Sequence, residues 1–529
     1  MANITKVYLL DTPLDKNYEH TLYFKNADEQ SAYFSSKVKF YFDDFSYQRK
    51  DHIIRVNKQV DELLGCNYVM YQNKAYTNKW FYAFITKMEY INDDRTDIYI
   101  ETDVLQTWLE EYTVNASFVE REHVAVDNTG EYTYLENVEM GSMVVNAHEE
   151  LGANDLSDLR YVIASTYNPS TQDDEAGVLV NGIYSGVKYF TYPTATSVNA
   201  ALSIIVNNGK TDAVTSVFMC PSSYVGGDVV GEITANSLGP VTKDYYVSKQ
   251  TTLDGYTPRN KKLLCYPFNY LLISNSGGGN AIFRYEEFSE DSCTFTNYGV
   301  ITPGVSMRLI PTKYKKCTFN YDEGLTGAKY PICNFATDSY TNWLTYNSVN
   351  QKYDLLDSAV SIAGSVVGGT VGGFMAGGPV GAITGGVGGL ITGGYTGGMQ
   401  IARTLEQKRL ASLVPDQAKG NLNSGDVTTA MGCNCYQVYK MSIKKEYAQM
   451  IDGYFDMYGY QVNTLKVPNK NHRYSWWYTK TISANITGAI PCEDLSKIKE
   501  CYNNGITFWR TPATMLDYSQ DNTTITWSE

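Results

Sequence analysis

A stretch of 45 residues, Ser358 to Ala402, contains no Asp, Glu, Lys, Arg or His and limits what this chain can fold into. Sixteen of its residues are glycine, and most others are Val, Ile, Ala, Thr, Phe, Met and Leu. A soluble core avoids so much glycine, because glycine loses much conformational entropy on folding and adds no side chain to pack. Flexible linkers are rich in Gly and Ser rather than in Val and Ile. The composition suits a lipid bilayer.

The stretch has the length of two membrane-spanning segments. Residues Ser358–Gly377 and Val380–Ala402 are each about the 20 apolar residues that cross the hydrocarbon core as a helix. Glycines recur at a spacing of four along both halves, which allows close helix packing in lipid and makes a poor helix in water. We therefore predict a membrane-active hairpin. A permanently buried Gly-rich loop and a disordered segment are the alternatives.

Particular residues are assigned to this predicted membrane-penetrating loop. The turn between its halves is formed by Gly377, Gly378 and Pro379. The side chains expected to enter the membrane share an apolar character and are Val360, Ile362, Val366, Val367, Val371, Phe374, Met375, Val380, Ile383, Val387, Leu390, Ile391, Met399 and Ile401.

The charge balance argues against one class of function. Acidic residues number 57 against 43 Lys and Arg, for a formal net charge of −14. Tight nucleic-acid binding needs clustered cations that displace the counterions of the phosphates. The charge balance is compatible with a surface past which DNA slides without sticking and without sequence-specific binding.

Length and composition indicate several β-rich domains. At 529 residues the chain is too long for one core and should form three or four domains. Its 45 tyrosines favour strands. The ten cysteines form no CxxC pair, so we expect free thiols made in a reducing compartment. The first residues lack a secretory signal, which indicates a protein made in the cytoplasm that meets a membrane later.

Local patterns predict individual elements. Before residue 110 we expect a small β-barrel or sandwich with one helix, near Arg55–Leu64, a strand at Lys37–Phe42, and a hairpin of Phe84–Ile91 with Ile98–Thr102. Residues 118–262 have the looser texture of an inserted domain. Further on we predict a hairpin of Tyr270–Ser274 with Ala281–Tyr285, and helices at Asp338–Asn347, Met399–Val414 and Asp494–Asn503.

Catalytic and cofactor motifs are weak. Asn207–Thr211 ends like a phosphate-binding loop, but Ile204 stands where that motif needs glycine, and a turn between strands explains it better. His148-Glu149-Glu150 lacks the second histidine of a zinc protease, and Cys433-Asn434-Cys435 has no partner pair. The run Trp476-Trp477-Tyr478 beside basic residues (Lys470, His472, Arg473) fits a packed strand better than a platform for bases. We predict no catalytic, metal or cofactor site.

Several longer motifs have a more specific meaning. The clearest is Ser117-Phe118-Val119-Glu120-Arg121-Glu122-His123-Val124, followed by Leu135-Glu136-Asn137. The others are Val7-Tyr8-Leu9-Leu10, Tyr266-Pro267-Phe268, Val467-Pro468-Asn469 with Arg473, and Gly505-Ile506-Thr507-Phe508-Trp509. Together they resemble the tail knob, or distal tail tube, proteins of small short-tailed bacteriophages. The similarity spans most of the chain and is weakest between residues 150 and 260.

The resemblance implies a mainly β fold with some α, in which two β-barrel tube domains carry a variable β-rich knob and a long Gly-rich apolar loop. On this chain the parts are the first tube domain (1–117), the knob or insert (118–262), the first part of the second tube domain (263–350), the apolar loop with a flanking helix (351–419), and the completion of the second tube domain (420–529).

The resemblance also implies a function without enzymatic activity. Family members form a homo-hexameric tube at the distal end of the virion tail, joined to the upper tail tube or collar component. Their apolar loops plug the lumen and, on host contact, enter the host cytoplasmic membrane to make a channel for the passing viral double-stranded DNA. The loop corresponds in place to residues 358–402.

Two other classes of function remain as alternatives. A permanently membrane-anchored protein would fail to dissolve without detergent. A tail-borne cell-wall hydrolase would clear host walls even without residues 358–402.

Overall fold

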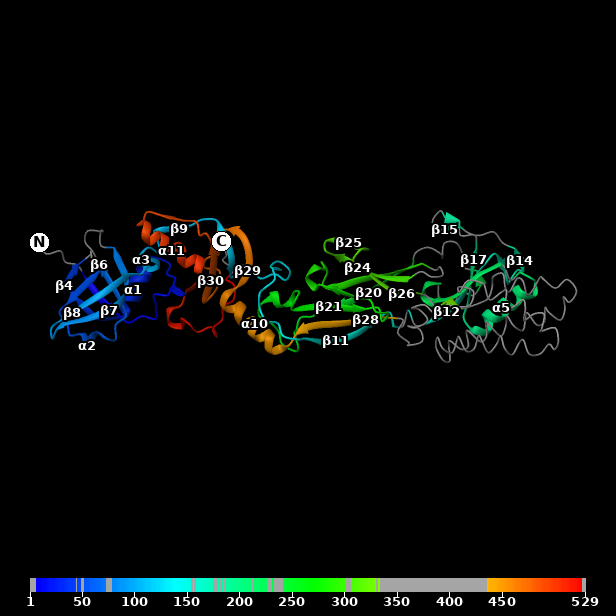
Figure 1. Cartoon of the computed structure of the whole chain (residues 1–529), viewed down its shortest axis with the longest axis horizontal. Coiled ribbons are helices and arrows are strands. Elements are labelled where there is room, and N and C mark those ends of the chain that lie inside the picture. Colours follow the sequence, from blue (N-terminus) through cyan, green and yellow to red (C-terminus); the bar gives the residue numbers. More distant parts are fainter. Residues whose placement is uncertain are drawn as a thin grey trace, which may run out of the picture. The chain divides into compact units, whose positions relative to one another are not determined.

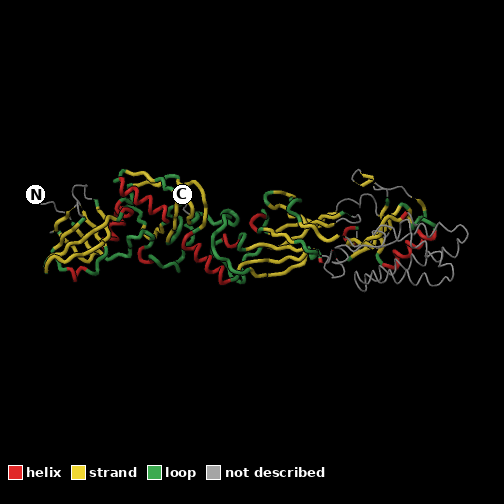
Figure 2. The backbone as a smooth tube through the Cα atoms, in the orientation of Figure 1, coloured by secondary structure: helices red, strands yellow, loops and turns green. Residues whose placement is uncertain are grey.

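The structure is a computed structural model that describes residues 6–43, 45–48, 52–72, 79–153, 156, 158–174, 179–180, 183–184, 187–210, 213–225, 231–232, 241–300, 306–329, 332–333 and 435–525. Strands dominate these residues (Figure 1, Figure 2), which confirms the predicted mainly β fold with some α. The chain forms two compact units. Unit 1 comprises Met1–Gly141, Gly255–Pro267 and Lys444–Glu529, and unit 2 comprises Ser142–Asp254 and Phe268–Ile443.

A seven-stranded antiparallel sheet opens unit 1. In spatial order its strands are β3 (Val38–Phe42), β1 (Val7–Leu10), β6 (Tyr68–Gln72), β7 (Trp80–Asn92), β8 (Arg95–Thr102), β5 (Ile53–Val56) and β4 (Phe45–Gln48). Phe40 of the edge strand β3 joins Ile54 and Val56 of β5 in one hydrophobic cluster. Since strands near both edges share a core, the sheet curls around it.

Two predicted elements of this sheet are confirmed and one is wrong. The strand at Lys37–Phe42 is β3, and the predicted hairpin is the antiparallel pair β7 and β8. The helix predicted over Arg55–Leu64 is only the short α2 (Val60–Leu63), because Arg55 belongs to strand β5. Buried Ile54 and Val56 alternate with Arg55, which is the period of a strand.

The prediction of a single helix before residue 110 is also wrong. Helix α1 (Ala27–Ser36) begins after Asn26, whose side chain accepts a hydrogen bond from the Glu29 amide (2.9 Å), while the Glu29 carboxylate accepts from the Lys25 amide (2.9 Å). This reciprocal pair resembles a capping box. Helix α3 (Val104–Thr107) is capped in a similar way by the carboxylate of Asp103.

A five-stranded sheet of unit 1 joins the two ends of the chain. Its strands are, in order, β2 (His20–Leu22), β32 (Ile506–Trp509), β30 (Trp476–Ile482), β10 (Ser117–Glu122) and β29 (Tyr460–Lys466). Beside it, β9 (Tyr112–Val114) pairs with β31 (Ile486–Gly488). This pairing groups residues 444–529 with the N-terminal part, whereas the sequence-based boundaries place them with 263–350. The assignment of tube and knob domains stays a prediction.

The aromatic run in β30 is a packed strand, as predicted. Trp476 and Trp477 are 1% and 3% exposed. Trp476 lies opposite Trp509 of β32, with ring centroids 5.1 Å apart, and Trp477 stacks on Phe508 at 5.5 Å. The faces of these rings are therefore covered by other side chains and offer no platform for bases.

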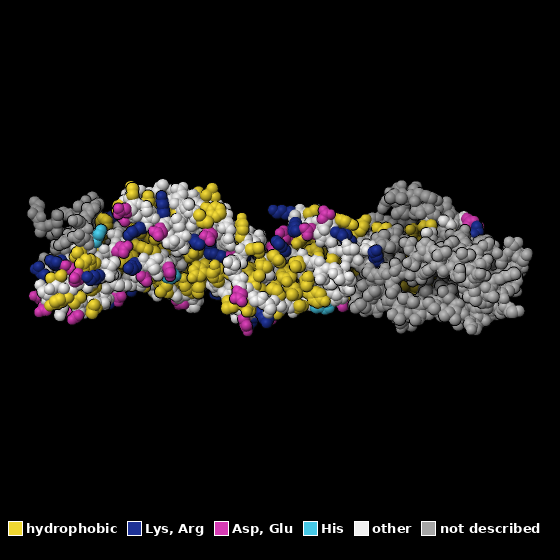
Figure 3. All heavy atoms as spheres, viewed as in Figure 1, with side chains coloured by type: hydrophobic (Ala, Val, Ile, Leu, Met, Phe, Trp, Pro, Cys, Tyr) yellow, Lys and Arg dark blue, Asp and Glu magenta, His cyan; other side chains and the backbone are white. Residues whose placement is uncertain are grey.

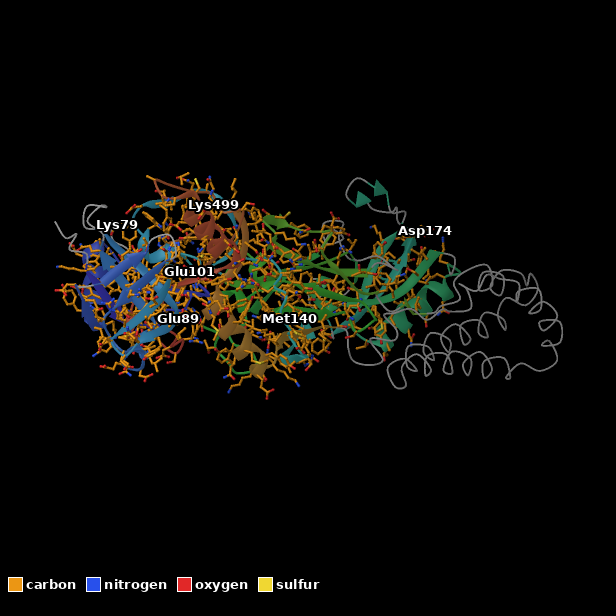
Figure 4. All side chains as sticks on the ribbon, turned by 60° about the vertical axis from the view of Figure 1, so that its left-hand side comes forward. Lys79, Glu89, Glu101, Met140, Asp174 and Lys499 are labelled. Atoms are coloured by element: carbon orange, nitrogen blue, oxygen red, sulfur yellow. The ribbon has the colours of Figure 1, made fainter. Side chains whose placement is uncertain are left out.

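Two helices pack in the C-terminal part of unit 1. Helix α11 (Cys492–Asn504) confirms the helix predicted at Asp494–Asn503, and its Lys497 donates to Glu101 of β8 (3.2 Å); Figure 4 labels Glu101 and, on α11, Lys499. Helix α10 (Lys445–Tyr458) was not predicted from the sequence. It ends at Gly459, whose φ of +64° suits glycine, and a Cβ there would collide with the carbonyl group of Glu122.

In unit 2, two sheets share one core. The four-stranded sheet has the order β11 (Met143–Leu151), β28 (Tyr436–Ile443), β21 (Asn269–Ser274) and β22 (Asn280–Phe283). The other sheet contains β20 (Val241–Ser248), β23 (Ser292–Gly299), β24 (Ser306–Tyr314), β25 (Cys317–Phe319) and β26 (Leu325–Lys329). Leu271 and Val438 from the first sheet and Phe295 from the second lie in a common cluster. The hairpin of β21 and β22 was predicted correctly.

A third sheet of unit 2 carries a helix. Its strands are β19 (Gly231–Glu232), β17 (Lys188–Tyr192), β12 (Leu159–Ser165), β18 (Val214–Pro221) and β27 (Ile332–Cys333). Smaller pairs are β13 (Tyr167–Asn168) with β14 (Asp173–Asp174) and β15 (Leu179–Val180) with β16 (Ile183–Tyr184). Helix α5 (Ala195–Asn207) packs on the sheet through Val198, Leu202 and Ile205. The Asn208-Gly209 turn therefore follows a helix and does not connect two strands as predicted. A phosphate loop would precede a helix instead.

Candidate functional site

The predicted membrane-penetrating loop lies outside the described residues. This holds for every assigned side chain from Val360 to Ile401, for the turn Gly377–Pro379, and for the predicted helices Asp338–Asn347 and Met399–Val414. Within the described parts of the chain, no helix is both long and apolar enough to span a bilayer. The structure does define the two strands between which the loop is inserted.

Both of these strands belong to sheets of unit 2. Before the loop, β27 pairs with β18, so that Ile332 lies opposite Phe218 and Cys333 opposite Val217. After the loop, β28 lies between β11 and β21 and is paired along both of its edges. The apolar segment is thus inserted between two strands that are themselves held in sheets.

Strand β28 is further fixed by buried polar side chains. The hydroxyl group of Tyr436, at the start of the strand, donates to Asn297 Oδ1 (3.1 Å), and burial raises the pKa of Tyr436 well above its ordinary value. The buried Lys440 Nζ donates to Ser248 Oγ (2.7 Å) and pairs with Glu149 Oε1 (2.6 Å). Buried donors and charges with such partners hold one register, because a shifted register would leave them unpaired.

A second constellation lies in unit 1, where the motif Ser117–Val124 forms β10 and the turn after it. The buried carboxylate of Glu122 accepts hydrogen bonds from the amide (2.8 Å) and Nδ2 (3.0 Å) of Asn469 and pairs with Lys466. Burial raises the pKa of Glu122, and these partners oppose that shift. Glu122 and Asn469, taken from two separate motifs, thus meet in one contact.

The motif residue Glu136 is the centre of an ion-pair triad. Its side chain is fully buried and pairs with Arg121 and with Lys262. It also accepts a hydrogen bond from the Gln461 amide (2.9 Å). Burial lowers the pKa of Lys262, and the carboxylate of Glu136 opposes that shift. The triad joins β10, the 255–267 segment and β29.

His123 completes the motif as a neutral, structural histidine. Its Nδ1 accepts from the Tyr478 amide (2.7 Å), and its Nε2 lies 2.9 Å from the carbonyl oxygen of Asp456. An accepting Nδ1 requires the proton on Nε2, which then donates to that carbonyl. Burial, with the charge of Arg473, lowers the pKa of His123 to about 3.

Helix α10 is held by a carboxylate on its buried side. Asp452 accepts hydrogen bonds from the Tyr256 hydroxyl (2.6 Å), the Arg259 amide (2.8 Å) and the Asn260 amide (3.0 Å). Asn260 Nδ2 also donates to Asp456 (2.8 Å). The segment 255–267 is thereby tied to residues that follow the loop in sequence.

We name the residues Arg121, Glu122, His123, Glu136, Lys262, Asp452 and Asn469 the polar hub. Five of these residues, Arg121, Glu122, His123, Glu136 and Asn469, belong to the family motifs, but the sequence indicated no role for them. The charged side chains of the hub are matched by partners within the same chain, and charges neutralised in this way serve as cross-links rather than as acids or bases. Because the hub connects all three chain segments of unit 1, its role is to hold that unit together.

The remaining candidate residues do not form a site. His148 and Glu149 lie on β11, where Glu149 pairs with Lys440, and the buried Cys435 accepts a hydrogen bond from Gln437 Nε2 (3.2 Å). Arg473 donates to the carbonyl oxygen of Val124 (2.9 Å). Among the described residues, no three His, Cys, Asp or Glu side chains are grouped so that they could hold a metal.

One cavity of unit 1 has a volume of about 170 Å³. Lys470 at its wall lies 6.0 Å from the centroid of the Tyr112 ring, and burial lowers the pKa of Lys470. Tyr23, Trp477 and Phe508 also line the cavity. These rings pack against one another, because Tyr23 contacts Trp477 and Trp477 stacks on Phe508, so the cavity is a gap in the aromatic core.

Known proteins similar to this chain give a consistent identification. The family described as Bacillus phage phi29 tail knob protein gp9, C-terminal domain, matches residues 234–523, which is more than half of the chain. The family described as the caudoviral major tail protein N-terminus matches residues 3–113.

Individual relatives match along almost the whole chain. The tail knob protein gp9 of Bacillus phage B103 is 24% identical over 588 aligned positions, and that of Bacillus phage phi29 is 24% identical over 592; each match covers 97% of both chains. The solved structure of the bacteriophage C1 tail knob protein gp12 superposes with a TM-score of 0.65 at 15% identity. It covers 98% of this chain and 100% of that one, and it shows a shared fold. The chain therefore belongs to the tail knob protein family of short-tailed bacteriophages, whose members are structural components of the virion tail and not enzymes.

Proposed function

We propose that this chain forms the distal tail tube and knob of a short-tailed bacteriophage, and that residues 358–402 open the host cytoplasmic membrane to the viral DNA. One observation carries the proposal: a charge-free, Gly-rich run of 45 residues is inserted between two sheet strands of a tail knob protein. A segment of that composition is costly to leave in water, and a bilayer offers it a favourable environment.

In this proposal the chain acts as a homo-hexamer joined to the upper tail tube or collar component. Residues 1–117, 263–350 and 420–529 supply the tube, and 118–262 supply the knob. Six apolar segments plug the lumen of the tube, where they are hidden from water and from other virions. Hiding them matters, because exposed apolar patches of that size promote aggregation.

On host contact the segments leave the lumen and enter the membrane. Helical backbone in lipid satisfies its own hydrogen bonds, and glycines spaced four apart let neighbouring helices pack closely. Double-stranded DNA then passes through the vacated tube. The net charge of −14 supports free passage, since like charge prevents the DNA from binding tightly to its conduit.

A vesicle assay tests this function. Purified chain is added, with a host envelope fraction as trigger, to dye-filled vesicles of host-membrane lipid composition. We expect dye release from the parent and at least a tenfold loss when residues 358–402 are replaced by a Gly/Ser sequence of equal length. Equal release from both proteins would contradict the proposal. Circular dichroism of the replacement protein checks that its sheets are intact.

A further inference from the structure

The outer face of the four-stranded sheet in unit 2 carries two apolar rows beside a polar row that contains Gln437, Glu150 and Ser274. Along β21, Leu271 and Ile273 are buried in the shared core, whereas Tyr270 and Leu272 alternate with them and point to the other side. Along β28, Val438 faces the core and Tyr439 and Met441 face outward in the same way. Sheets that are solvated on one face normally carry polar residues there.

The strand register aligns these outward residues in two rows. In one row Tyr439 lies opposite His148 on β11 and opposite Leu272 on β21, and Leu272 lies opposite Ile282 on β22. The rings of His148 and Tyr439 stack with centroids 4.9 Å apart. The row therefore crosses all four strands without an acidic residue, Lys or Arg.

The second row lies beside the first. Met441 of β28 has Val145 as its partner on β11 and Tyr270 as its partner on β21. Val145 is 52% exposed, and Ile282 in the first row is 50% exposed. Figure 3 shows hydrophobic side chains gathered over the part of unit 2 where Figure 1 labels β21 and β28. A contiguous apolar surface of this kind marks a binding face.

The chain itself indicates what binds there. Strand β28, a central strand of this sheet, is the first described element after the apolar segment. Residues 403–434 connect the two and, at roughly 3.3 Å per residue when extended, reach about 100 Å. The sheet is only about 15 Å wide across its four strands. A tether of this kind keeps a segment at an effective concentration of the order of millimolar over its own sheet.

The two partners are also chemically complementary. The rows offer Tyr, Leu, Met, Ile and Val side chains, and residues 358–402 carry no charge that would have to be desolvated against them. Glycine lets a backbone approach a flat side-chain surface closely, because it has no Cβ. Before release, such a contact would shield both apolar surfaces from water.

We infer that the outer face of the β11-β28-β21-β22 sheet is the surface on which the chain's own segment 358–402 rests before release. The inference rests on the proposed function, since it names the place where the stowed segment is held. It does not require the rows to contact any other protein.

Photo-crosslinking tests the inference in the full-length protein. A benzophenone amino acid replaces Leu272, and in a control protein it replaces Leu465, a 71% exposed residue of β29 in unit 1. We expect cross-links from position 272 into residues 358–402 at the mass of a single chain, and none into that segment from position 465. Cross-links from position 272 to a second chain, or to peptides outside 358–402, would overturn the inference.

A charge introduced on the face provides an independent readout. Ile282→Lys should weaken docking and raise dye release without the envelope fraction several-fold, and Leu465→Lys should leave that release unchanged. Equal release from the two variants would count against docking. If release depends on residues 358–402 but the cross-links miss them, only the docking inference fails. If release never depends on them, the proposed function fails first.

Discussion

The polar hub of unit 1 buries charges that are matched within the chain, whereas the outer sheet face of unit 2 leaves apolar side chains exposed. In the hub, buried charges such as Glu122 and Glu136 are matched by cations and amides from distant parts of the same chain. On the outer face, Ile282 and Val145 remain about half exposed although they are apolar. The hub is complete within one chain, whereas apolar side chains of the face remain exposed.

This difference indicates that the hub determines the stability of the fold and that the face takes part in binding. A fully paired charge network gives little favourable energy compared with a hydrophobic core, but removing one partner is severe. It therefore fixes one arrangement of the three segments of unit 1. An exposed apolar face stabilises the folded chain little and gains when a partner covers it. Substitutions in the hub should change stability, and substitutions on the face should change binding.

The largest effect is expected for Glu136→Gln in the hub. The change leaves the charges of Arg121 and Lys262 without their carboxylate, and breaking such a buried pair costs about 3–5 kcal/mol. Denaturant unfolding followed by tryptophan fluorescence measures it, since Trp476 and Trp509 lie in unit 1. The exposed pair Asp11–Lys39, which also lies in unit 1, is the control, and Asp11→Asn should leave stability unchanged. Similar stability of both variants would contradict the role of the hub.

Two adjacent leucines sharpen the contrast within one strand. Leu271 is fully buried in the core of unit 2, and Leu272 faces outward. Leu271→Ala should cost about 2–5 kcal/mol, because it removes packed methyl groups and leaves a cavity. Leu272→Ala should change stability by less than about 0.5 kcal/mol and yet increase untriggered dye release. Hydrogen exchange of the β21 amides measures the stability of both variants. Equal protection in the two variants would show that the two faces of the strand do not differ in this way.

A smaller loss is expected for Asn469→Ala. It removes the Nδ2 donor to Glu122 but keeps the backbone amide that also donates to it. A buried acceptor that loses one partner costs about 1–3 kcal/mol. The thermal midpoint of unit 1 should therefore fall less than in Glu136→Gln. A drop as large as that of Glu136→Gln would show that the side chain, not the ion pairs, holds the hub.

The last prediction concerns pH and is measured as a change in stability per pH unit. The pKa of His123 is about 3 in the folded chain and about 6.5 when unperturbed. Between these values the unfolded chain binds a proton that the folded chain does not, so this contribution to stability is lost as the pH falls, by up to about 1.4 kcal/mol per pH unit. His123→Asn should remove one proton from the pH dependence of unfolding between pH 6.5 and 4.

Asp103 changes the pH dependence of stability in the opposite direction. Comparing His123→Asn with the parent isolates the contribution of His123, because Asp103 is present in both proteins. Burial raises its pKa to about 6, so the folded chain keeps a proton there that the unfolded chain releases. Its contribution to stability is therefore lost as the pH rises toward 6. If the parent and His123→Asn unfold with the same pH dependence, His123 is not held neutral in the folded chain.

The sequence predicted the elements that local patterns determine. Alternation indicated β3, and the turn residues 92–95 and 277–279 indicated the two hairpins. A helix was also expected where α11 lies. Helix α10 was not predicted, because its buried side includes Asp452, and the partners of that carboxylate come from residues 256–260. Ala448, Ile451 and Phe455, at helical spacing before Gly459, are the signal that was available.

Residues 358–402 and the outer sheet face differ in whether the sequence alone reveals them. Composition alone singled out residues 358–402, since a long charge-free run is unusual anywhere in a chain. The outer sheet face is invisible in the sequence, because Leu272 and Ile282 become neighbours only through strand register. The hub was also not predicted from the sequence, since the partners of Glu122 and Glu136 include Asn469 and Lys262, which lie far away in the chain.

Labelling from within the membrane shows whether residues 358–402 enter lipid. Vesicles that contain a photoactivatable lipid probe are mixed with the full chain, with and without the host envelope fraction, and labelled peptides are identified by mass spectrometry. We expect labels within Val360–Ile401 only after the trigger, and none on β10, β28 or α10. Labels on the sheets of either unit, with residues 358–402 unlabelled, would contradict it.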